Sequence, residues 1–429
     1  MRAGDTIVAL SSGALPSGVA VIRVSGPASR TILEAIHPKG AEPRRLSLAD
    51  IRLGGEVLDR GLLAWMPGPN SFTGEDCLEL QVHGSVAVVK AMLREITRFS
   101  GVRLAEAGEF TRRAFENGKL DLTEVEGLGD LISAETEGQR KQALARAGGG
   151  LTKKLDGWRE RLLDLRAEIE ARLDFSDESD VDELPDSLVD ELAALQAEFA
   201  AAAQSVAGGR IVREGFRVAL AGKPNAGKSS LLNAIAQSDV AIVTDEAGTT
   251  RDIKEVPLDL GGQLVILVDM AGLRETDSKA EAEGVRRARE QIEAADLVLW
   301  LQAPEFGPDN MIPPDAWVIA TKADLGQGTG DRRVSAKTGE GIPALIEAIR
   351  QQAASRVGSA EAPLVSRERD RLALEAAAGA VRQAIDDFGN EELMAEWLRR
   401  ASHALERLLG RMDAEAVLDR LFLAFCIGK

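Results

Sequence analysis

The sequence predicts a multidomain fold with an α+β amino-terminal domain, an all-α helical domain and an inserted α/β domain. Strand-like runs punctuated by Gly and Pro fill the first 118 residues, and helical apolar periodicity fills two later, separated stretches. Strands and helices alternate between those two stretches. With 429 residues, the chain is long enough to form several hydrophobic cores.

The amino-terminal domain is expected over residues 1–118. Its strand-like runs are Thr6–Leu10, Val19–Ser25, Gly61–Trp65 and Cys77–Val82. Apolar residues recur at helical spacing within Ser85–Phe99, which predicts a helix after the last of these strands. The combination predicts an α+β domain.

The helical domain is expected in two parts, residues 119–212 and 356–429. One apolar face in the first part is formed by Trp158, Leu162, Leu165, Ile169 and Leu173. A second face is formed by Met394, Trp397, Leu398, Ala401, Leu405, Leu408 and Met412. Because both faces need covering, we expect the two parts to pack together around an inserted domain. An Ala-rich helix is expected to end near Gly208-Gly209, and the acidic stretch 174–183 is interpreted as a solvated linker.

The inserted domain is expected over residues 213–355. Its buried strands are predicted at Val218–Ala221, Leu264–Val268, Leu297–Leu301 and Val318–Thr321. A helix is predicted at Ser229–Ala236, and the Pro-rich segment Gln302–Ala316 is expected to be a loop. This alternation predicts a mostly parallel sheet.

Composition limits the partners and the compartment. The net charge of −17 requires any nucleic-acid contact to be local or shared with a partner. Cys77 and Cys426 form neither a metal-type spacing nor a disulfide framework, which is typical of a reducing cytoplasm. The first residues lack the features of a signal peptide, and no apolar run reaches the length of a membrane span. We therefore expect a soluble cytoplasmic protein with no membrane contact.

The strongest motif is the run Gly222–Ser229, which satisfies the phosphate-loop pattern G-x-x-x-x-G-K-[ST] between a predicted strand and a predicted helix. Glycines allow backbone N–H groups to surround phosphates, and Lys228 supplies a cation to them. Ser229 is expected to hold Mg²⁺. The alternative interpretation, a glycine-rich turn that binds no ligand, is disfavoured because the motif lies between a predicted strand and a predicted helix.

Discrimination of GTP from ATP is assigned to a second motif, Thr321-Lys322-Ala323-Asp324. The carboxylate of Asp324 can accept two hydrogen bonds from guanine, whereas adenine would present an acceptor to it. The triplet Ser335-Ala336-Lys337 is expected to close over the base. Each short match is weak alone, but their order and spacing after the phosphate loop favour a guanine site.

Further candidates for the metal and the γ-phosphate lie between these motifs. Asp269 follows a predicted strand and is expected to hold the Mg²⁺ shell, while Gly272 can approach the γ-phosphate. A hydroxyl of the loop Thr249-Thr250, assigned to Thr250, can reach Mg²⁺ when GTP is bound, which predicts a switch. Leu273 cannot orient water as a Ras-type glutamine does.

The whole chain resembles the MnmE (TrmE) family of tRNA-modification GTPases. The motifs that carry the resemblance are Asp5–Ala9, Pro67–Asp76, Gly118–Leu122, Gly248–Asp252 and the terminal Cys426-Ile427-Gly428-Lys429. The resemblance implies a homodimer joined by folate-binding amino-terminal domains, and a G domain that hydrolyses GTP with assistance from K⁺. It identifies the inserted domain as a P-loop GTPase (G) domain.

The resemblance also assigns residues. The GTP-binding residues would be Asn225, Ala226, Gly227, Lys228, Ser229, Ser230, Thr244, Thr249, Thr250, Asp269, Gly272, Thr321, Lys322, Asp324, Ser335, Ala336 and Lys337. The K⁺ ligands would be Asn225, Thr244, Glu246 and Thr249. Glu281 would orient the attacking water, with Asn225 and Cys426 as further catalytic candidates. The site for 5-formyltetrahydrofolate, or a related one-carbon folate, would be formed by Arg23, Glu79, Lys119 and Lys429, which sequence alone would class as ordinary surface charge.

The family implies a partner as well. A flavin- and NADH-dependent enzyme, MnmG (GidA), would form a heterotetramer with the homodimer and add an aminomethyl or carboxymethylaminomethyl group to the wobble uridine of tRNA. Cys426 follows an apolar helical face. Two interpretations therefore stay open: a catalytic cysteine, which the motif match indicates, and a small buried residue at a helix end.

Two departures from the family pattern and two rival readings remain. Met270 and Thr321 stand where members commonly have Thr and Asn, and Thr321 is predicted to brace the phosphate loop less well and to weaken nucleotide binding. The main rival is an Era-like GTP-dependent RNA or ribosome assembly switch. The other is a helical scaffold with a degenerate nucleotide site.

Overall fold

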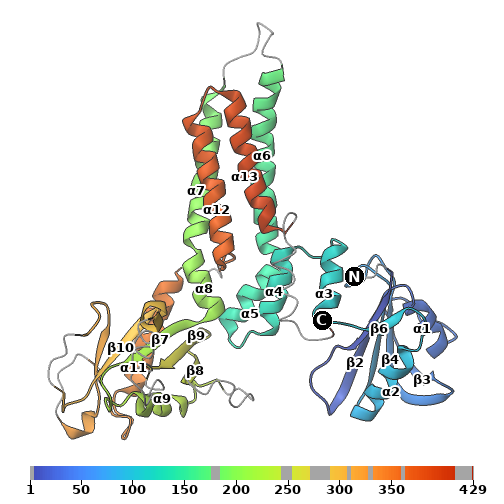
Figure 1. The fold of residues 1–429 in the computed structure, drawn as a ribbon, viewed down its shortest axis with the longest axis horizontal. Coiled ribbons are helices and arrows are strands. Elements are labelled where there is room, and N and C mark those ends of the chain that lie inside the picture. The colour runs from blue at the N-terminus through green and yellow to red at the C-terminus, as the bar shows by residue number, and fades with distance from the viewer. Residues whose placement is uncertain are drawn as a thin grey trace, which may run out of the picture. The chain divides into compact units, whose positions relative to one another are not determined.

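The computed structural model describes residues 4–174, 184–242, 254–270, 290–306, 311–326, 332–358, 363–410 and 428 (Figure 1). The chain divides into two compact units. One comprises Met1–Gly129 with Glu406–Lys429, and the other comprises Asp130–Leu405. Each unit contains a hydrophobic core of its own.

The amino-terminal unit is built on a six-stranded sheet in the order β3-β4-β5-β2-β1-β6. Its strands are β1 (Thr6–Leu10), β2 (Ser17–Ser25), β3 (Leu46–Leu53), β4 (Glu56–Met66), β5 (Cys77–Gly84) and β6 (Val102–Leu104). Its helices are α1 (Ser29–Ile36), α2 (Val86–Ile96), α3 (Glu109–Glu116) and α4 (Leu122–Ile132), the last of which crosses the unit boundary. The four predicted strands and the helix after β5 are confirmed, whereas β3, β6, α1 and α3 were not predicted.

The two faces of this sheet differ. On one face, alternate residues such as Ile22 and Val24 are buried together with the apolar residues of α1 and α2. On the other face, Phe110 of α3 covers β1. Towards the β3 edge that second face is open, because Leu46 and Leu48 are 57% and 59% exposed.

The second unit contains the helical domain. Its helices are α5 (Glu137–Ala147), α6 (Gly150–Asp174), α7 (Asp186–Gln204), α8 (Val206–Glu214), α12 (Glu368–Asp386) and α13 (Glu391–Leu408). The predicted apolar faces are confirmed at Trp158, Leu162, Leu165, Ile169, Met394, Leu398, Ala401, Leu405 and Leu408, all of which are buried. Leu173 and Trp397 are half-buried, and Met412 lies outside the described residues. Helix α12 packs along α7, so the two parts of the helical domain meet as expected (Figure 1).

The predicted Ala-rich helix is α7, which ends at Gln204 and not at Gly208-Gly209; a separate helix, α8, runs through both glycines to Glu214. The reason is close packing. A Cβ atom on Gly208 would lie 2.5 Å from the carbonyl oxygen of Val357, and one on Gly209 would lie 2.0 Å from that of Val365. These glycines therefore allow backbone segments to approach α8 and do not end it.

The G domain has the predicted mostly parallel sheet, in the order β12-β11-β10-β7-β9-β8, in which only β8 and β9 pair antiparallel. Its strands are β7 (Phe216–Ala221), β8 (Lys254–Asp259), β9 (Leu264–Asp269), β10 (Leu297–Gln302), β11 (Trp317–Ala320) and β12 (Arg332–Arg333). The helices are α9 (Lys228–Ala236), η2 (Ala323–Leu325) and α11 (Ile342–Val357). Among the described residues between β10 and β11 there is no helix, which agrees with the predicted loop.

The G domain is inserted into the helical domain, and side chains of α5 join the segments on either side of it. The Gln142 side-chain amide donates to the carbonyl oxygens of Gly209, before the G domain, and Pro363, after it, at 3.1 and 2.7 Å. Arg146 and Asp370 form a fully buried ion pair at 3.2 Å.

Candidate functional site

The phosphate loop follows β7, a strand in which every residue except Arg217 is buried. The loop turns sharply because Gly222 and Gly227 adopt φ of 132° and 96°, and Asn225 adopts φ of 64°. A Cβ atom on Gly222 would lie only 2.4 Å from the carbonyl oxygen of Leu301. The loop is thus held close to the end of β10, between β7 and α9.

Lys228 lies over this loop. Its side chain is 8% exposed, and its ammonium group donates to the carbonyl oxygens of Gly222 and Lys223 at 2.7 and 3.0 Å. A cation held against a loop at a helix amino terminus is the arrangement that binds the β- and γ-phosphates of a nucleotide.

The predicted Mg²⁺ ligands are also brought together. The register of β7 against β9 aligns Leu220 with Asp269, so both strands end at the same edge of the sheet. The Ser229 hydroxyl donates to the Asp269 carboxylate at 2.6 Å, and Asp269 is buried. Two oxygen ligands at this position fit Mg²⁺, which prefers oxygen donors.

Thr321 braces the phosphate loop directly. It lies just beyond the end of β11, and its buried hydroxyl donates to the carbonyl oxygen of Ala226 at 2.7 Å. Thr321 therefore makes one hydrogen bond to the loop, and weaker bracing than by Asn stays a prediction. Any difference in nucleotide affinity remains a prediction.

The predicted guanine site is formed by two neighbouring turns. Lys322, at φ of 55°, leads into η2, which exposes Asp324. The Ser335 hydroxyl donates to Asp324 at 2.7 Å, and this bond lowers the pKa of the carboxyl, with the charge of Lys337 acting in the same direction. Ser335 is fully buried and Ala336 is half-buried, while Lys337 is exposed. Asp324 is therefore held as an anion that can accept hydrogen bonds from guanine.

Of the remaining loop residues, Asn225 and Ser230 are exposed. Several predicted site residues lie outside the described residues, namely Thr244, Glu246, Thr249, Thr250, Gly272, Glu281, Cys426 and Lys429.

A second candidate site lies on the amino-terminal sheet. Arg23 of β2 and Glu79 of β5 are register partners and form an ion pair at 2.8 Å, with side chains 23% and 20% exposed. The Arg23 guanidinium lies 5.5 Å from the centre of the Phe72 ring. Lys119 is exposed, and a Cβ atom on Gly74 would lie 3.4 Å from its Cε atom. Arg23 and Glu79 are thus brought together.

The carboxyl terminus reaches the same unit. The Ser11 hydroxyl donates to the carbonyl oxygen of Gly428 at 2.7 Å, and a Cβ atom on Gly428 would lie 2.1 Å from the carbonyl oxygen of Leu10. Only glycine fits this close approach to the end of β1. Gly428 is therefore held at the end of β1.

The sequence reasoning missed Arg113, which organises the motifs at the start of the chain. Its guanidinium donates to the carboxylates of Asp5 at 2.6 Å, Glu109 at 3.1 Å and Glu75 at 3.1 Å, and its side chain is 8% exposed. Burial opposes ionisation of Asp5 and Glu109, but the hydrogen bonds and charges of Arg103 and Arg113 outweigh it and lower the pKa of both. Asp5 and Glu75 belong to two of the sequence motifs that carry the family resemblance. Their acidic side chains were the signal from which a buried cationic partner could have been predicted.

Within the described part of the chain, no helix is both long and apolar enough to cross a membrane.

Comparison with known proteins covers the whole chain. The family model described as the MnmE helical domain matches residues 122–426, and the model described as the GTP-binding protein TrmE N-terminus matches residues 6–119. The tRNA modification GTPase MnmE of Azorhizobium caulinodans is 50% identical, with 100% of both chains covered. The protein of the same name from Brucella ovis is 48% identical over 99% of this chain and 98% of its own.

Solved structures similar to part of the chain include Aquifex aeolicus Era bound to GDP and AlF4⁻. It is 24% identical, the match covers 39% of this chain and 66% of the Era chain, and the TM-score is 0.27. The G domain of the FeoB iron transporter of T. maritima is 23% identical, covers 33% of this chain and 98% of its own, and has a TM-score of 0.24. The match to two family models and the identity over full length to the curated relatives carry the assignment: the chain belongs to the MnmE family of tRNA modification GTPases.

Proposed function

We propose that this GTP hydrolase acts in the cytoplasm as a homodimer, with Mg²⁺ and K⁺, in wobble-uridine modification of tRNA. Together with an FAD- and NADH-dependent MnmG (GidA) partner in a heterotetramer, it adds an aminomethyl or carboxymethylaminomethyl group at C5. The observation that carries the proposal is the phosphate loop, with Lys228 above it and Asn225 exposed at positive φ. Family membership supplies the chemistry of the substrate.

Two divalent-ion ligands are supported by geometry. Ser229 and Asp269 would hold Mg²⁺, Asp269 through water, because their oxygens meet at the end of β9 beside the loop. Thr250 would complete this set in the GTP state. Mg²⁺ neutralises charge that develops on the phosphates. The residues of the chain bind and orient the nucleotide around it.

The K⁺ ligands centre on Asn225. Its amide side chain is exposed on the loop, and its carbonyl-type oxygen fits a hard cation. Thr244, Glu246 and Thr249 would complete the set. K⁺ would supply the positive charge that an arginine finger supplies in other GTPases. Glu281 would orient the attacking water, since Leu273 cannot.

The folate site is supported by the Arg23–Glu79 pair. A partly exposed carboxylate beside a guanidinium and the ring of Phe72 suits a flat heterocycle that carries both donors and acceptors. Lys119 and Lys429 would add positive charge for the carboxylates of a folate, and Gly428 is held at the end of β1 in the same unit. The folate would provide the one-carbon group, and the role of Cys426 in its transfer is a separate proposal.

Dimer formation through the amino-terminal domain is supported by the open part of its sheet. Leu46 and Leu48 pair with Ala64 and Leu62 in register, so four apolar side chains share the open face. Sedimentation of the full-length protein should give a dimer, and charge introduced by Leu48→Glu should shift it to monomer.

The modification is tested by nucleoside analysis of tRNA from cells that lack the protein. We expect the C5 substituent of the wobble uridine to be missing and to return with the wild-type gene. An unchanged nucleoside profile would defeat the assignment.

The role of potassium is tested separately with the isolated protein. GTP turnover should be fast in K⁺ and slow in Na⁺ buffer, and Asn225→Ala should remove the difference. Glu281→Ala should bind GTP yet hydrolyse it slowly, so full activity of that variant would remove Glu281 from the mechanism.

A further inference from the structure

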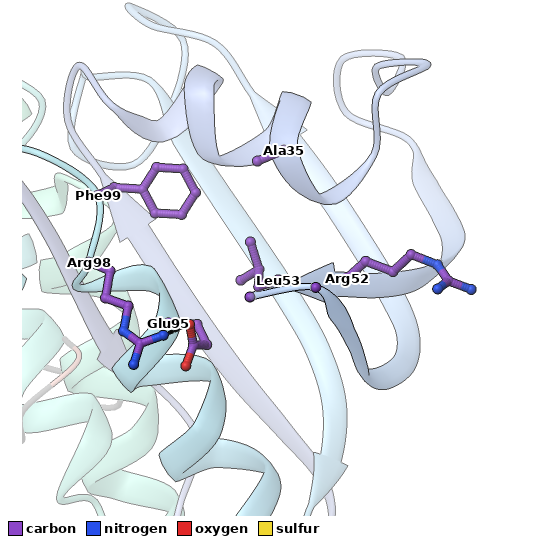
Figure 2. A pocket seen from close by; sticks show the side chains of 8 residues that line it. Ala35, Arg52, Leu53, Glu95, Arg98 and Phe99 are labelled. Carbon is purple, nitrogen blue, oxygen red and sulfur yellow. Dashed lines mark hydrogen bonds and ion pairs between the residues drawn. The ribbon is translucent and has the colours of Figure 1, made fainter.

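A pocket lies on the helix-covered side of the amino-terminal sheet. Its volume is about 470 Å³, and its lining includes Ala35 of α1, Leu53 and Gly54 of the β3–β4 hairpin, and Glu95, Arg98 and Phe99 at the end of α2 (Figure 2). Leu53 belongs to the core under α1 and α2, whereas Arg23 alternates with Ile22 and Val24 of that core. The pocket and the proposed folate site therefore lie on opposite faces of the sheet.

The groups that a ligand in the pocket would contact include one aromatic ring and one ion pair. Phe99 points towards Leu53 and Ala35, while Glu95 and Arg98 lie together at one side (Figure 2). The Glu95 side chain is 7% exposed and accepts hydrogen bonds from Arg94 at 3.0 Å and Arg98 at 2.6 Å. Apolar walls with a few convergent polar groups, including a ring and a guanidinium plane, are typical of sites that hold an unstacked nucleobase.

A row of cations runs from this pocket along α2. Lys90 and Arg94 lie four residues apart on one side of α2, about 6 Å apart along its axis, and Arg98 follows in the turn after the helix, which ends at Ile96. All three are exposed, and the only acidic residue of α2, Glu95, is buried beneath two of them. We call these three residues the α2 ridge.

The charge of this region contrasts with the rest of the protein. Residues 1–118 carry 14 Lys and Arg against 13 Asp and Glu, whereas the whole chain carries 52 against 69. A chain of net charge −17 can contact a polyanion only where cations are concentrated. The α2 ridge is such a place.

We propose that the pocket and the α2 ridge together bind single-stranded RNA, with phosphates along the ridge and one unstacked base in the pocket beside Phe99. The proposal rests on the proposed function, because it identifies the surface that contacts the loop of a tRNA substrate. An acidic protein would also suit the ridge, but it would not need a ring and a guanidinium beside a cavity of this size. RNA accounts for both features.

The test measures equilibrium binding of the full-length protein to a fluorescently labelled tRNA anticodon stem-loop at several salt concentrations. Lys90→Gln should weaken binding severalfold and lower the slope of log Kd against log salt by about 0.7, the value for one single-strand phosphate contact. Lys39→Gln, at an exposed lysine outside the ridge and the pocket, is the matched control and should bind as the wild type does.

The pocket is tested by filling it. Ala35→Trp places a large side chain at an exposed helical position that lines the pocket, and it should weaken stem-loop binding by about 5- to 150-fold, the range expected for one stacked base. Thr31→Trp, on the exposed surface of the same helix and outside the lining, is its control. GTP turnover should be unchanged in all four variants, and an unchanged urea transition of the amino-terminal domain reports that they are folded.

Three outcomes would overturn the proposal. The first is wild-type affinity in both Lys90→Gln and Ala35→Trp. The second is absence of stem-loop binding by the wild-type chain, and the third is loss of binding to a partner protein while RNA binding is unchanged. None of them decides the proposed function, because the nucleoside analysis of cellular tRNA tests that independently.

Discussion

The phosphate loop and the amino-terminal sheet place their functional groups by different means. In the loop, the backbone conformations of Gly222, Asn225 and Gly227 place Lys228 and its neighbours within eight consecutive residues. In the sheet, Arg23 and Glu79 are 56 positions apart and meet only through the pairing of β2 with β5. A local site is readable from a motif, whereas a site made by strand register depends on the whole domain being folded.

That difference predicts that the amino-terminal site is more sensitive to the loss of a remote buried group. Replacing Arg113 by Met would remove one of the two cations that Asp5 and Glu109 share and leave them paired with Arg103 alone, at a cost of about 1.5–3 kcal/mol in unfolding free energy. Urea denaturation followed through the unfolding of the amino-terminal domain measures it. Arg30→Met, which removes only the exposed pair with Glu34, should cost less than about 1 kcal/mol. Equal effects of the two changes would contradict the comparison.

The loop predicts a loss of chemistry without a comparable loss of folding. Lys228→Ala removes the cation held over the loop, so single-turnover GTP hydrolysis should fall about 10²- to 10³-fold, while the amino-terminal transition in urea is unchanged. The matched control is Lys223→Ala on the same loop, whose ammonium lies 5.8 Å from the centre of the Phe306 ring. Turnover that falls as far in the control would mean that the loop is sensitive to any lost cation.

Acid should separate the two regions in another way. The pKa values of Asp5 and Glu109 are lowered in the folded protein, so their stabilisation is complete above the unfolded values of about 3.9 and 4.3 and is lost as pH falls through the folded values. The urea midpoint of the amino-terminal domain should therefore decline from about pH 5 downward. Arg113→Met should flatten this decline, and a steeper decline in the variant would refute the assignment.

The sequence predicted the central strands and the phosphate loop of the G domain because their signals are local, whereas the edge strands β8 and β12 were not predicted. Short apolar strands and one glycine-rich turn predicted β7, β9, β10 and the loop, and parallel pairing then brought Ser229 to Asp269. The interaction of Ser335 with Asp324 was not foreseen, since the triplet was assigned to the base itself. A hydroxyl that holds a carboxylate has no signature in spacing alone.

The amino-terminal domain shows what spacing could not provide. Strand β3 was not predicted because exposed Leu46 and Leu48 disrupt the alternation of apolar and polar residues expected for a half-buried strand. The role of Arg113 was missed because its partners lie 4, 38 and 108 positions away. A helix end was predicted at Gly208 and Gly209 for a related reason, since their contacts are with Val357 and Val365, about 150 residues later.

The smallest effect is expected at Thr321. This residue, after β11, combines the two kinds of placement, because it contacts the local loop motif from about 95 positions later in the sequence. Thr321→Val removes one buried hydrogen bond to Ala226, which should weaken GTP binding by about 1 kcal/mol, roughly fivefold in Kd. Thr321→Asn introduces an amide that can reach the loop with both a donor and an acceptor, so it should bind GTP more tightly than the wild type. Nucleotide titration of the three proteins under one buffer measures both changes. Affinity unchanged by Thr321→Asn would show that one hydroxyl braces the loop as well as the family's usual amide does.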